Sequence, residues 1–231
     1  MEIILDALTE AIRLLVDRDP AMLEITGLTL RVTFTALVLA MAVGIPVGAA
    51  LGLSRRIPAA GCVLPLIYTG MGLPPVVVGL AVYLVLSNRG PLGGLDWLFT
   101  PAAMIFAQAL IALPLVVGLT LIAVGSLDPD LPLQVRALGA TRRQLAATML
   151  VEARYGLFAA IVAAFGAIIS EVGAVMLVGG NIDGETRVLT TAIVLETRRG
   201  NFALALALGI VLLGLAFLAN WVFYRLQREG K

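Results

Sequence analysis

The sequence predicts an all-α membrane protein with five transmembrane helices, an N-terminal amphipathic helix and a long cytoplasmic loop. Of the 231 residues, 60% are apolar and only 13% are charged, whereas a soluble domain carries about 25% charged residues. The charged residues are separated by uncharged runs, and these runs lack the alternation of a transmembrane β-strand. Composition and charge pattern together therefore favour membrane-spanning helices.

Five uncharged runs provide the five spans, because about 20 apolar residues cross a bilayer as a helix. The fourth run reaches that length only if it continues past one internal charge, Glu171. The runs cover residues 32–54, 57–88, 97–127, 155–182 and 200–224. Prolines lie in or near several of them: Pro46, Pro58, Pro65, Pro74, Pro75, Pro101 and Pro114. Proline interrupts helical hydrogen bonding, so we expect irregular backbone that is buried in protein or lines a water-filled space.

Glycines repeat at every fourth position of the first span, at Gly44, Gly48 and Gly52. Such a stripe lets a neighbouring helix approach closely. Close packing is one interpretation, and a bundle whose helices move is the other.

The first 26 residues differ from the rest. On a helical wheel, one arc is polar and the opposite arc is apolar; the polar arc holds Glu2, Asp6, Thr9, Glu10, Arg13 and Asp17. This predicts an amphipathic helix on the membrane or against the bundle, ended by Pro20. We therefore divide the chain into an N-terminal segment, 1–26, and a transmembrane domain, 27–231, with a cytoplasmic loop at 128–154.

The distribution of Lys and Arg predicts the orientation. Nine of the 16 basic residues follow the first, third and fifth runs: Arg55, Arg56, Arg136, Arg142, Arg143, Arg154, Arg225, Arg228 and Lys231. This excess places the N-terminus outside and the C-terminus in the cytoplasm.

Several functions are excluded by residue content. The chain has no His and one Cys, Cys62, and its net charge is +1. We therefore expect no catalytic residues, no metal site, no bound cofactor and no nucleic-acid partner. No GxxxxGK[ST] run is present, so ATP and its Mg²⁺ must bind elsewhere.

The loop at 128–154 is the longest hydrophilic segment. After Pro129 and Pro132, residues 134–138 and 141–150 are predicted to form two short helices around Gly139-Ala140. A connection between two spans can be much shorter. The hairpin is therefore interpreted as a docking element for a partner, with an amphipathic loop on anionic lipid as the alternative.

The run Arg136-Ala137-Leu138-Gly139-Ala140, followed by Arg143, resembles the EAA loop of ABC importer permeases. Leu133-Gln134-Val135 stands where that family has Glu-Ala-Ala. The resemblance implies a type I ABC importer permease fold, in which this loop enters a cleft of the ATP-binding subunit. It assigns coupling to the ATPase to these residues: Gln134, Arg136, Ala137, Leu138, Gly139, Ala140 and Arg143.

Later motifs resemble the permeases of tungstate and molybdate importers. They are Ser170-Glu171-Val172-Gly173-Ala174, Gly179-Gly180-Asn181-Ile182, Thr186-Arg187 and the run from Leu189 to Ile193. The segment from Glu196 to Leu206 resembles the tungstate-type branch. The resemblance implies ATP-driven import of an oxyanion, tungstate before molybdate, by a homodimer with two ATP-binding cassette subunits and an extracytoplasmic oxyanion-binding protein.

Glu171 is the one deep charge, and ionising it in a membrane is costly. A carboxylate repels a dianion, so we do not expect it to bind the substrate directly. Three interpretations stay open: it pairs with an Arg, it caps a broken helix, or it is a protonated structural carboxyl. Its predicted location is the translocation path or gate.

Four further residues are predicted to line this path or gate. Gly179-Gly180-Asn181 should break the helix, and 186–196 should form a partly re-entrant helix. Asn181, Thr190 and Thr191 offer neutral donors to an anion, and Arg187 offers charge. In the alternative, the hydroxyls bind only backbone carbonyls.

Two other functions compete with this interpretation. One is a permease for sulfate, phosphate or another solute. The other is a stand-alone channel or secondary transporter, which should show an inverted repeat or a relay of ionisable residues. Neither feature is visible, so the sequence favours a multi-pass permease of the cell membrane.

Overall fold

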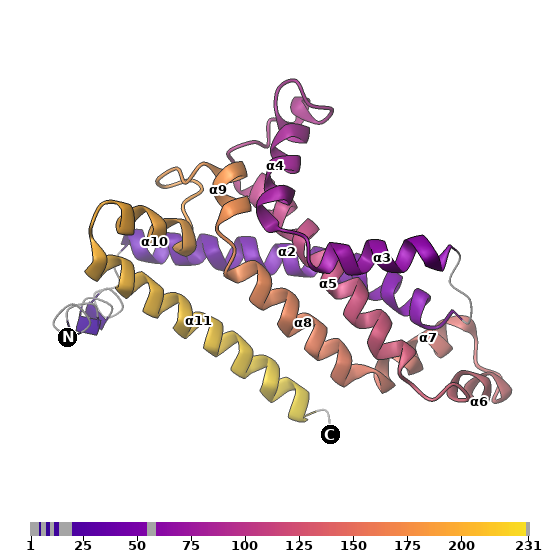
Figure 1. Cartoon of the computed structure of the whole chain (residues 1–231). Helices are drawn as coiled ribbons and strands as arrows, with labels where there is room; N and C mark the ends of the chain where they lie inside the picture. Colours follow the sequence, from indigo (N-terminus) through magenta and orange to yellow (C-terminus); the bar gives the residue numbers. More distant parts are fainter. Residues whose placement is uncertain (1–4, 6–7, 10–11, 14–19, 55–58, 230–231) are drawn as a thin grey trace.

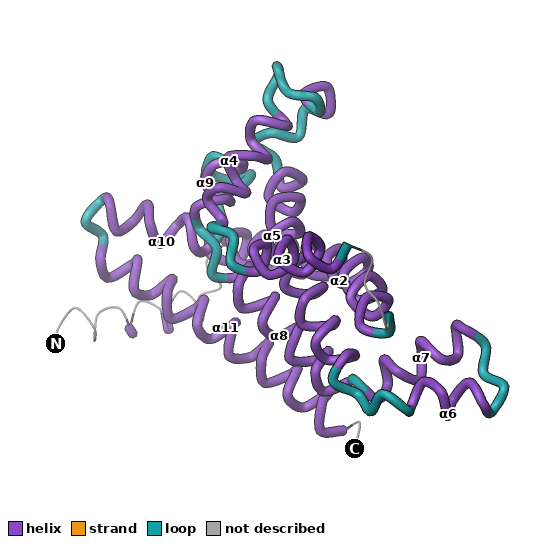
Figure 2. Tube along the Cα trace, turned by 45° about the vertical axis from the view of Figure 1, so that its right-hand side comes forward, coloured by secondary structure: helices purple, strands orange, loops and turns teal. Residues whose placement is uncertain are grey.

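The computed structural model describes residues 5, 8–9, 12–13, 20–54 and 59–229. Within these ranges all regular structure is helical (Figures 1 and 2). The helices are α2 (Pro20–Gly52), α3 (Ala60–Met71), α4 (Pro75–Leu86), η1 (Gly93–Leu95), α5 (Pro101–Gly125), α6 (Leu131–Ala137), α7 (Arg142–Glu152), α8 (Arg154–Ile169), α9 (Gly173–Gly179), α10 (Leu189–Arg198) and α11 (Phe202–Glu229). The all-α prediction is confirmed.

Three helices, α2, α5 and α11, are long and apolar enough to cross a membrane alone. Two further pairs of helices are long and apolar enough only when each pair is taken together, and both pairs are bent: α3 and α4 meet at 101°, and α7 and α8 meet at 71°. The predicted runs at 32–54, 57–88, 97–127 and 200–224 correspond to α2, α3–α4, α5 and α11. The predicted run at 155–182 corresponds to α8 and α9, and α7 lies in the predicted loop at 128–154.

The prolines differ in their effect. Pro46, Pro65 and Pro114 lie inside continuous helices, whereas α3 ends before Pro74 and α4 begins at Pro75. Proline suits the first helical position, where no intrahelical N–H bond is needed. The sharp bend therefore lies at the double proline.

Helix α5 is the centre of the bundle and packs against α2, α3, α4, α8 and α9. Its tightest partner is α2, along the predicted glycine stripe. A Cβ atom built on Gly48 would lie 2.5 Å from the Val117 carbonyl oxygen, and one on Gly44 would lie 2.8 Å from the Val116 side chain. The stripe thus serves close packing.

The N-terminal prediction is only partly visible. Most positions of the proposed amphipathic helix lie outside the described residues. Residues 20–26, which we assigned to that segment, form the first turns of α2, and Pro20 begins this helix instead of ending the preceding one. The reason is that proline fits the first turn of a helix.

The fourth uncharged run does not form one helix. Helix α8 ends at Ile169, and α9 begins at Gly173. A second break follows at Gly180 and Asn181, which have φ of 74° and 55°. The second break lies at the predicted Gly-Gly-Asn step, whereas the first, around Glu171, has a single glycine, Gly173, at the start of α9.

Candidate functional site

Glu171 lies at the break between α8 and α9 and is 9% exposed. Its Oε1 accepts a hydrogen bond from the Ala174 N–H at 2.9 Å. This N–H lies in the first turn of α9, where backbone donors lack intrahelical partners. Within the described residues, no Arg forms an ion pair with Glu171. The hydrogen bonding is therefore that of a cap on a broken helix.

Two further helices bind the backbone of this break. The Thr190 hydroxyl of α10 donates to the Glu171 carbonyl at 2.9 Å. The Gln108 side chain of α5 donates through Nε2 to the Ile168 carbonyl at 3.1 Å. Thr190 and Gln108 are 5% and 4% exposed. The interrupted backbone at this break is thereby shielded and satisfied by protein groups, as a break within a membrane would require.

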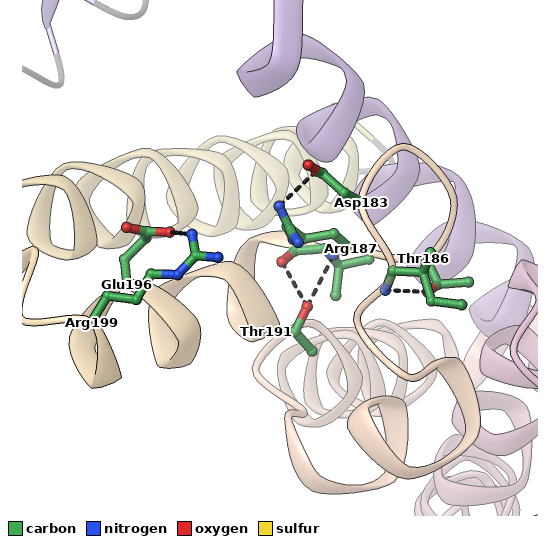
Figure 3. Close-up of polar contacts among 8 residues, drawn as sticks. Asp183, Thr186, Arg187, Thr191, Glu196 and Arg199 are labelled. Atoms are coloured by element: carbon green, nitrogen blue, oxygen red, sulfur yellow. Dashed lines mark hydrogen bonds and ion pairs between the residues drawn. The ribbon is translucent and has the colours of Figure 1, made fainter.

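The loop between α9 and α10 is held by its own side chains (Figure 3). The buried Thr186 hydroxyl donates to the Gly179 carbonyl at 2.6 Å and accepts from the Ile182 N–H at 2.9 Å. Arg187 pairs with Asp183 at 2.6 Å between Nη1 and Oδ1. This loop therefore has a defined shape that depends on local polar contacts.

The predicted re-entrant helix is α10, and Thr191 stabilises its start. The Thr191 hydroxyl accepts from the Val188 N–H at 3.1 Å and donates to the Val188 carbonyl at 3.0 Å (Figure 3). An unpaired backbone donor at a helix start is costly when buried. Thr191 is therefore used in capping.

The five predicted path residues do not converge on one ligand site. Thr190 and Thr191 are engaged with backbone groups, and Arg187 with Asp183. Asn181 has a buried Oδ1 that finds no partner among the described residues. Glu171 and Thr190 are brought together, at the α8–α9 break. The alternative interpretation of the hydroxyls, as backbone partners, describes these contacts.

Two buried polar residues were missed by the sequence reasoning. Gln108 lies in the uncharged run at 97–127, and a polar side chain in such a run is a signal of a functional or structural role. Glu196 is 8% exposed and holds the turn between α10 and α11, where Oε1 accepts from Arg199 at 2.9 Å (Figure 3) and Oε2 from Asn201 at 2.7 Å. Its single carboxylate thus binds both ends of that turn.

The loop at 128–154 forms the second candidate site. Helices α6 and α7 form a hairpin that projects from the end of the bundle opposite α9 and α10 (Figures 1 and 2). Leu138 at its tip is 89% exposed, and Gly139 beside it has φ of 84°. A positive φ suits glycine because it lacks a Cβ atom. The two predicted short helices are confirmed.

Helix α7 gives the hairpin a firm base. Thr141 and Gln144 form a capping box at its start, while Leu145 and Met149 are buried. Arg136, Arg142 and Arg143 are exposed. A cavity of about 630 Å³ separates α6 from the ends of α2 and α5. The hairpin thus carries an exposed leucine at its tip and exposed basic side chains.

The described residues include no cluster of three or more His, Cys, Asp or Glu side chains that could hold a metal ion.

Comparison with known proteins identifies the family. A family model for the binding-protein-dependent transport system inner membrane component matches residues 44–229. A Haloferax volcanii protein named "Probable anion ABC transporter permease protein" is 46% identical over 204 residues, covering 86% of this chain and 88% of the relative. The tungstate uptake system permease protein TupB of Peptoclostridium acidaminophilum is 42% identical over 233 residues, covering 99% and 100%.

A solved structure confirms the fold. A chain of the inward-facing MetNI methionine ABC transporter matches with a TM-score of 0.72 at 19% identity, covering 92% of this chain and 99% of that chain. The predicted type I importer fold and the resemblance to oxyanion permeases are confirmed. Members of this family are non-catalytic and bind no cofactor, since the ATPase subunit binds ATP. The chain belongs to the binding-protein-dependent transport system inner membrane component family and is a multi-pass permease subunit of an ABC importer.

Proposed function

We propose that this permease imports an oxyanion, tungstate or, as second choice, molybdate. The observation that carries the proposal is the match over essentially the whole chain to a tungstate uptake permease at 42% identity. The similarity to an anion permease at 46% identity supports the same class of substrate.

The test is ATPase activity of the purified complex with its binding protein, measured with tungstate, molybdate and sulfate in turn. Stimulation by tungstate or molybdate at lower concentration than by sulfate is the expected result. Stimulation by sulfate alone would point to the alternative substrate, and stimulation by none would reject the oxyanion class.

The α6–α7 hairpin is the proposed docking element for the ATP-binding subunit. ABC importer permeases pair with ATPase subunits and a binding protein. The proposal assigns the contact to Gln134, Arg136, Ala137, Leu138, Gly139, Ala140 and Arg143. Its support is the exposure of Leu138, because an 89% exposed leucine at a hairpin tip gains free energy when a partner covers it.

The proposed assembly is a homodimer of this chain with two ATP-binding cassette subunits and one extracytoplasmic oxyanion-binding protein. Five spans form half of a pathway. The N-terminus lies outside and the C-terminus in the cytoplasm, which agrees with placing the α6–α7 hairpin on the ATPase side. Closure of the ATPase subunits would draw the two hairpins together and turn the spans outward.

The α8–α9 break and the α9–α10 loop form the proposed gate. Glu171, Thr190 and Thr191 act as its framework, because their polar atoms hold backbone at the ends of α9 and α10. Asn181 and Arg187 lie on the connecting loop. Weak transient contacts are enough for passage through such a path, so the gate needs no tight anion site.

A further inference from the structure

Gln108 is a buried amide at an unexpected place. It lies in the apolar helix α5 and is 4% exposed. Its Nε2 donates to the Ile168 carbonyl at 3.1 Å, while its Oε1 is buried with no partner among the described residues. A half-satisfied buried amide costs free energy. Packing alone would be served better by an apolar residue, so the N–H bond to Ile168 is the contact to explain.

The Ile168 carbonyl belongs to the last turn of α8, where carbonyl groups have no partner in their own helix. The Ser170 hydroxyl donates a hydrogen bond to the Gly166 carbonyl at 2.8 Å. Besides the bond from Gln108, the Ile168 carbonyl accepts from the backbone N–H of the C-cap residue Ser170 and, at 3.3 Å, from the Glu171 N–H. Gln108 is the side-chain donor to this carbonyl from another helix. Gln108 therefore ties the end of α8 to α5.

The break is held from its other side by α10. Thr190 donates to the Glu171 carbonyl, and the Glu171 side chain caps α9. The position of α9 relative to α8 thus depends on polar bonds from two helices and one local cap. Gln108 supplies the bond from α5.

Helices α8 and α9 contact different parts of the protein at their far ends. At one end, α8 continues into α7 of the coupling hairpin through a 71° bend. At the other end, α9 packs on α4, where a Cβ atom on Gly79 would lie 2.5 Å from the Ala174 Cα. The Val178 carbonyl of α9 also accepts the Phe99 N–H at 2.8 Å, from the segment that leads into α5.

We propose that Gln108 is a positioning residue that sets the angle of the α8–α9 break and thereby transmits movement of the α6–α7 hairpin to the gate. The inference rests on the proposed gate and adds a residue outside it. A hydrogen bond of this kind changes the equilibrium constant between two arrangements of α8 and α9 by about tenfold. Its loss should therefore uncouple movement of α9 from movement of α8.

The experiment measures the distance across the break in the complete complex with its ATPase subunits. Spin labels are placed at Ala159→Cys on α8 and Leu177→Cys on α9, both exposed positions, after Cys62→Ser. The distance is compared without nucleotide and with trapped ATP. We expect a nucleotide-dependent change in the parent protein that is lost or broadened in Gln108→Met, which keeps the side-chain length without hydrogen bonds.

Thr120→Val is the matched control. Thr120 is a fully buried residue of the same helix whose hydroxyl has no partner among the described residues, and it faces α2 near Gly48. This variant should keep the nucleotide-dependent change. If Gln108→Met does not assemble, Gln108→Asn serves instead, because it keeps an amide but is one methylene too short to reach Ile168.

A second readout is the ratio of ATPase activity with and without tungstate-loaded binding protein. Gln108→Met should lower this ratio about tenfold, whereas a merely structural defect lowers the amount of complex and leaves the ratio unchanged. An unchanged distance response in Gln108→Met, or no response in the parent protein, would overturn the inference. Failure of the proposed substrate is distinct, because nucleotide would still move the labels while no oxyanion stimulated the ATPase.

Discussion

The Thr29 hydroxyl of α2 accepts a hydrogen bond from the Leu189 N–H of α10 at 3.0 Å, across 160 residues of sequence. The same hydroxyl donates to the Ile25 carbonyl at 2.7 Å. Thr29 and Leu189 are buried, at 3% and 0% exposure. A single hydroxyl thus fixes the start of α10 to α2.

Thr29→Val should therefore leave the Leu189 N–H buried and unpaired. We expect the free energy of unfolding to fall by about 1–3 kcal/mol, measured by thermal unfolding of the purified protein in detergent. Thr35→Val on the exposed side of the same helix is the control. An equal loss in both variants would contradict a specific role for the Thr29–Leu189 bond.

Glu171 can be tested as a helix cap by comparing two substitutions. Glu171→Gln keeps an acceptor oxygen for the Ala174 N–H, whereas Glu171→Ala removes it at a cost of about 1 kcal/mol. We expect Gln to retain more thermal stability and more oxyanion uptake in proteoliposomes than Ala. If both variants lose uptake equally, the negative charge itself is required, and capping does not explain the residue.

Leu138 should matter for assembly and little for folding, since almost all of its surface is exposed. Leu138→Asp places a charge at the tip of the hairpin, where a partner would have to desolvate it. We expect the ATPase subunit to be lost on co-purification while thermal unfolding of the permease alone is unchanged. Ala147→Asp, an exposed position on α7, is the control; retention of the ATPase by Leu138→Asp would refute the docking assignment.

Gly48 and Gly27 lie on the same helix and should respond in opposite directions to alanine. A Cβ atom on Gly48 would lie 2.5 Å from the Val117 carbonyl oxygen, whereas Gly27 has no neighbouring atom within 4 Å. Gly48→Ala should cost about 1–3 kcal/mol by overpacking. Gly27→Ala should add about 0.5–1 kcal/mol, because alanine favours a helix. Thermal unfolding of both variants checks this, and destabilisation by both would contradict it.

Local sequence signals were sufficient for much of the fold. Uncharged runs located the spans because a bilayer excludes charges. Gly139 and Gly180 marked turns because their positive φ needs a residue without a Cβ atom. The α6–α7 hairpin was predictable for the same local reasons.

The polar contacts at the α8–α9 break were not predictable in this way. The sequence left open whether Thr190 donates to an anion or to a backbone carbonyl. In the structure it donates to the Glu171 carbonyl, and Gln108 donates to the Ile168 carbonyl from 60 residues away. Neither glycine nor proline follows directly after Ile169, where α8 ends. Which hydroxyl or amide satisfies a freed backbone group depends on which helices lie side by side.

The sequence by itself determined that the chain crosses a membrane and that a helical hairpin with a glycine turn interrupts its apolar runs, because these features follow from charge, residue type and local turn geometry. Only the tertiary structure decided what Glu171, Thr190 and Gln108 do. Backbone groups at a break inside the bundle have no water to bind. The side chains that packing brings within reach must therefore supply the bonds.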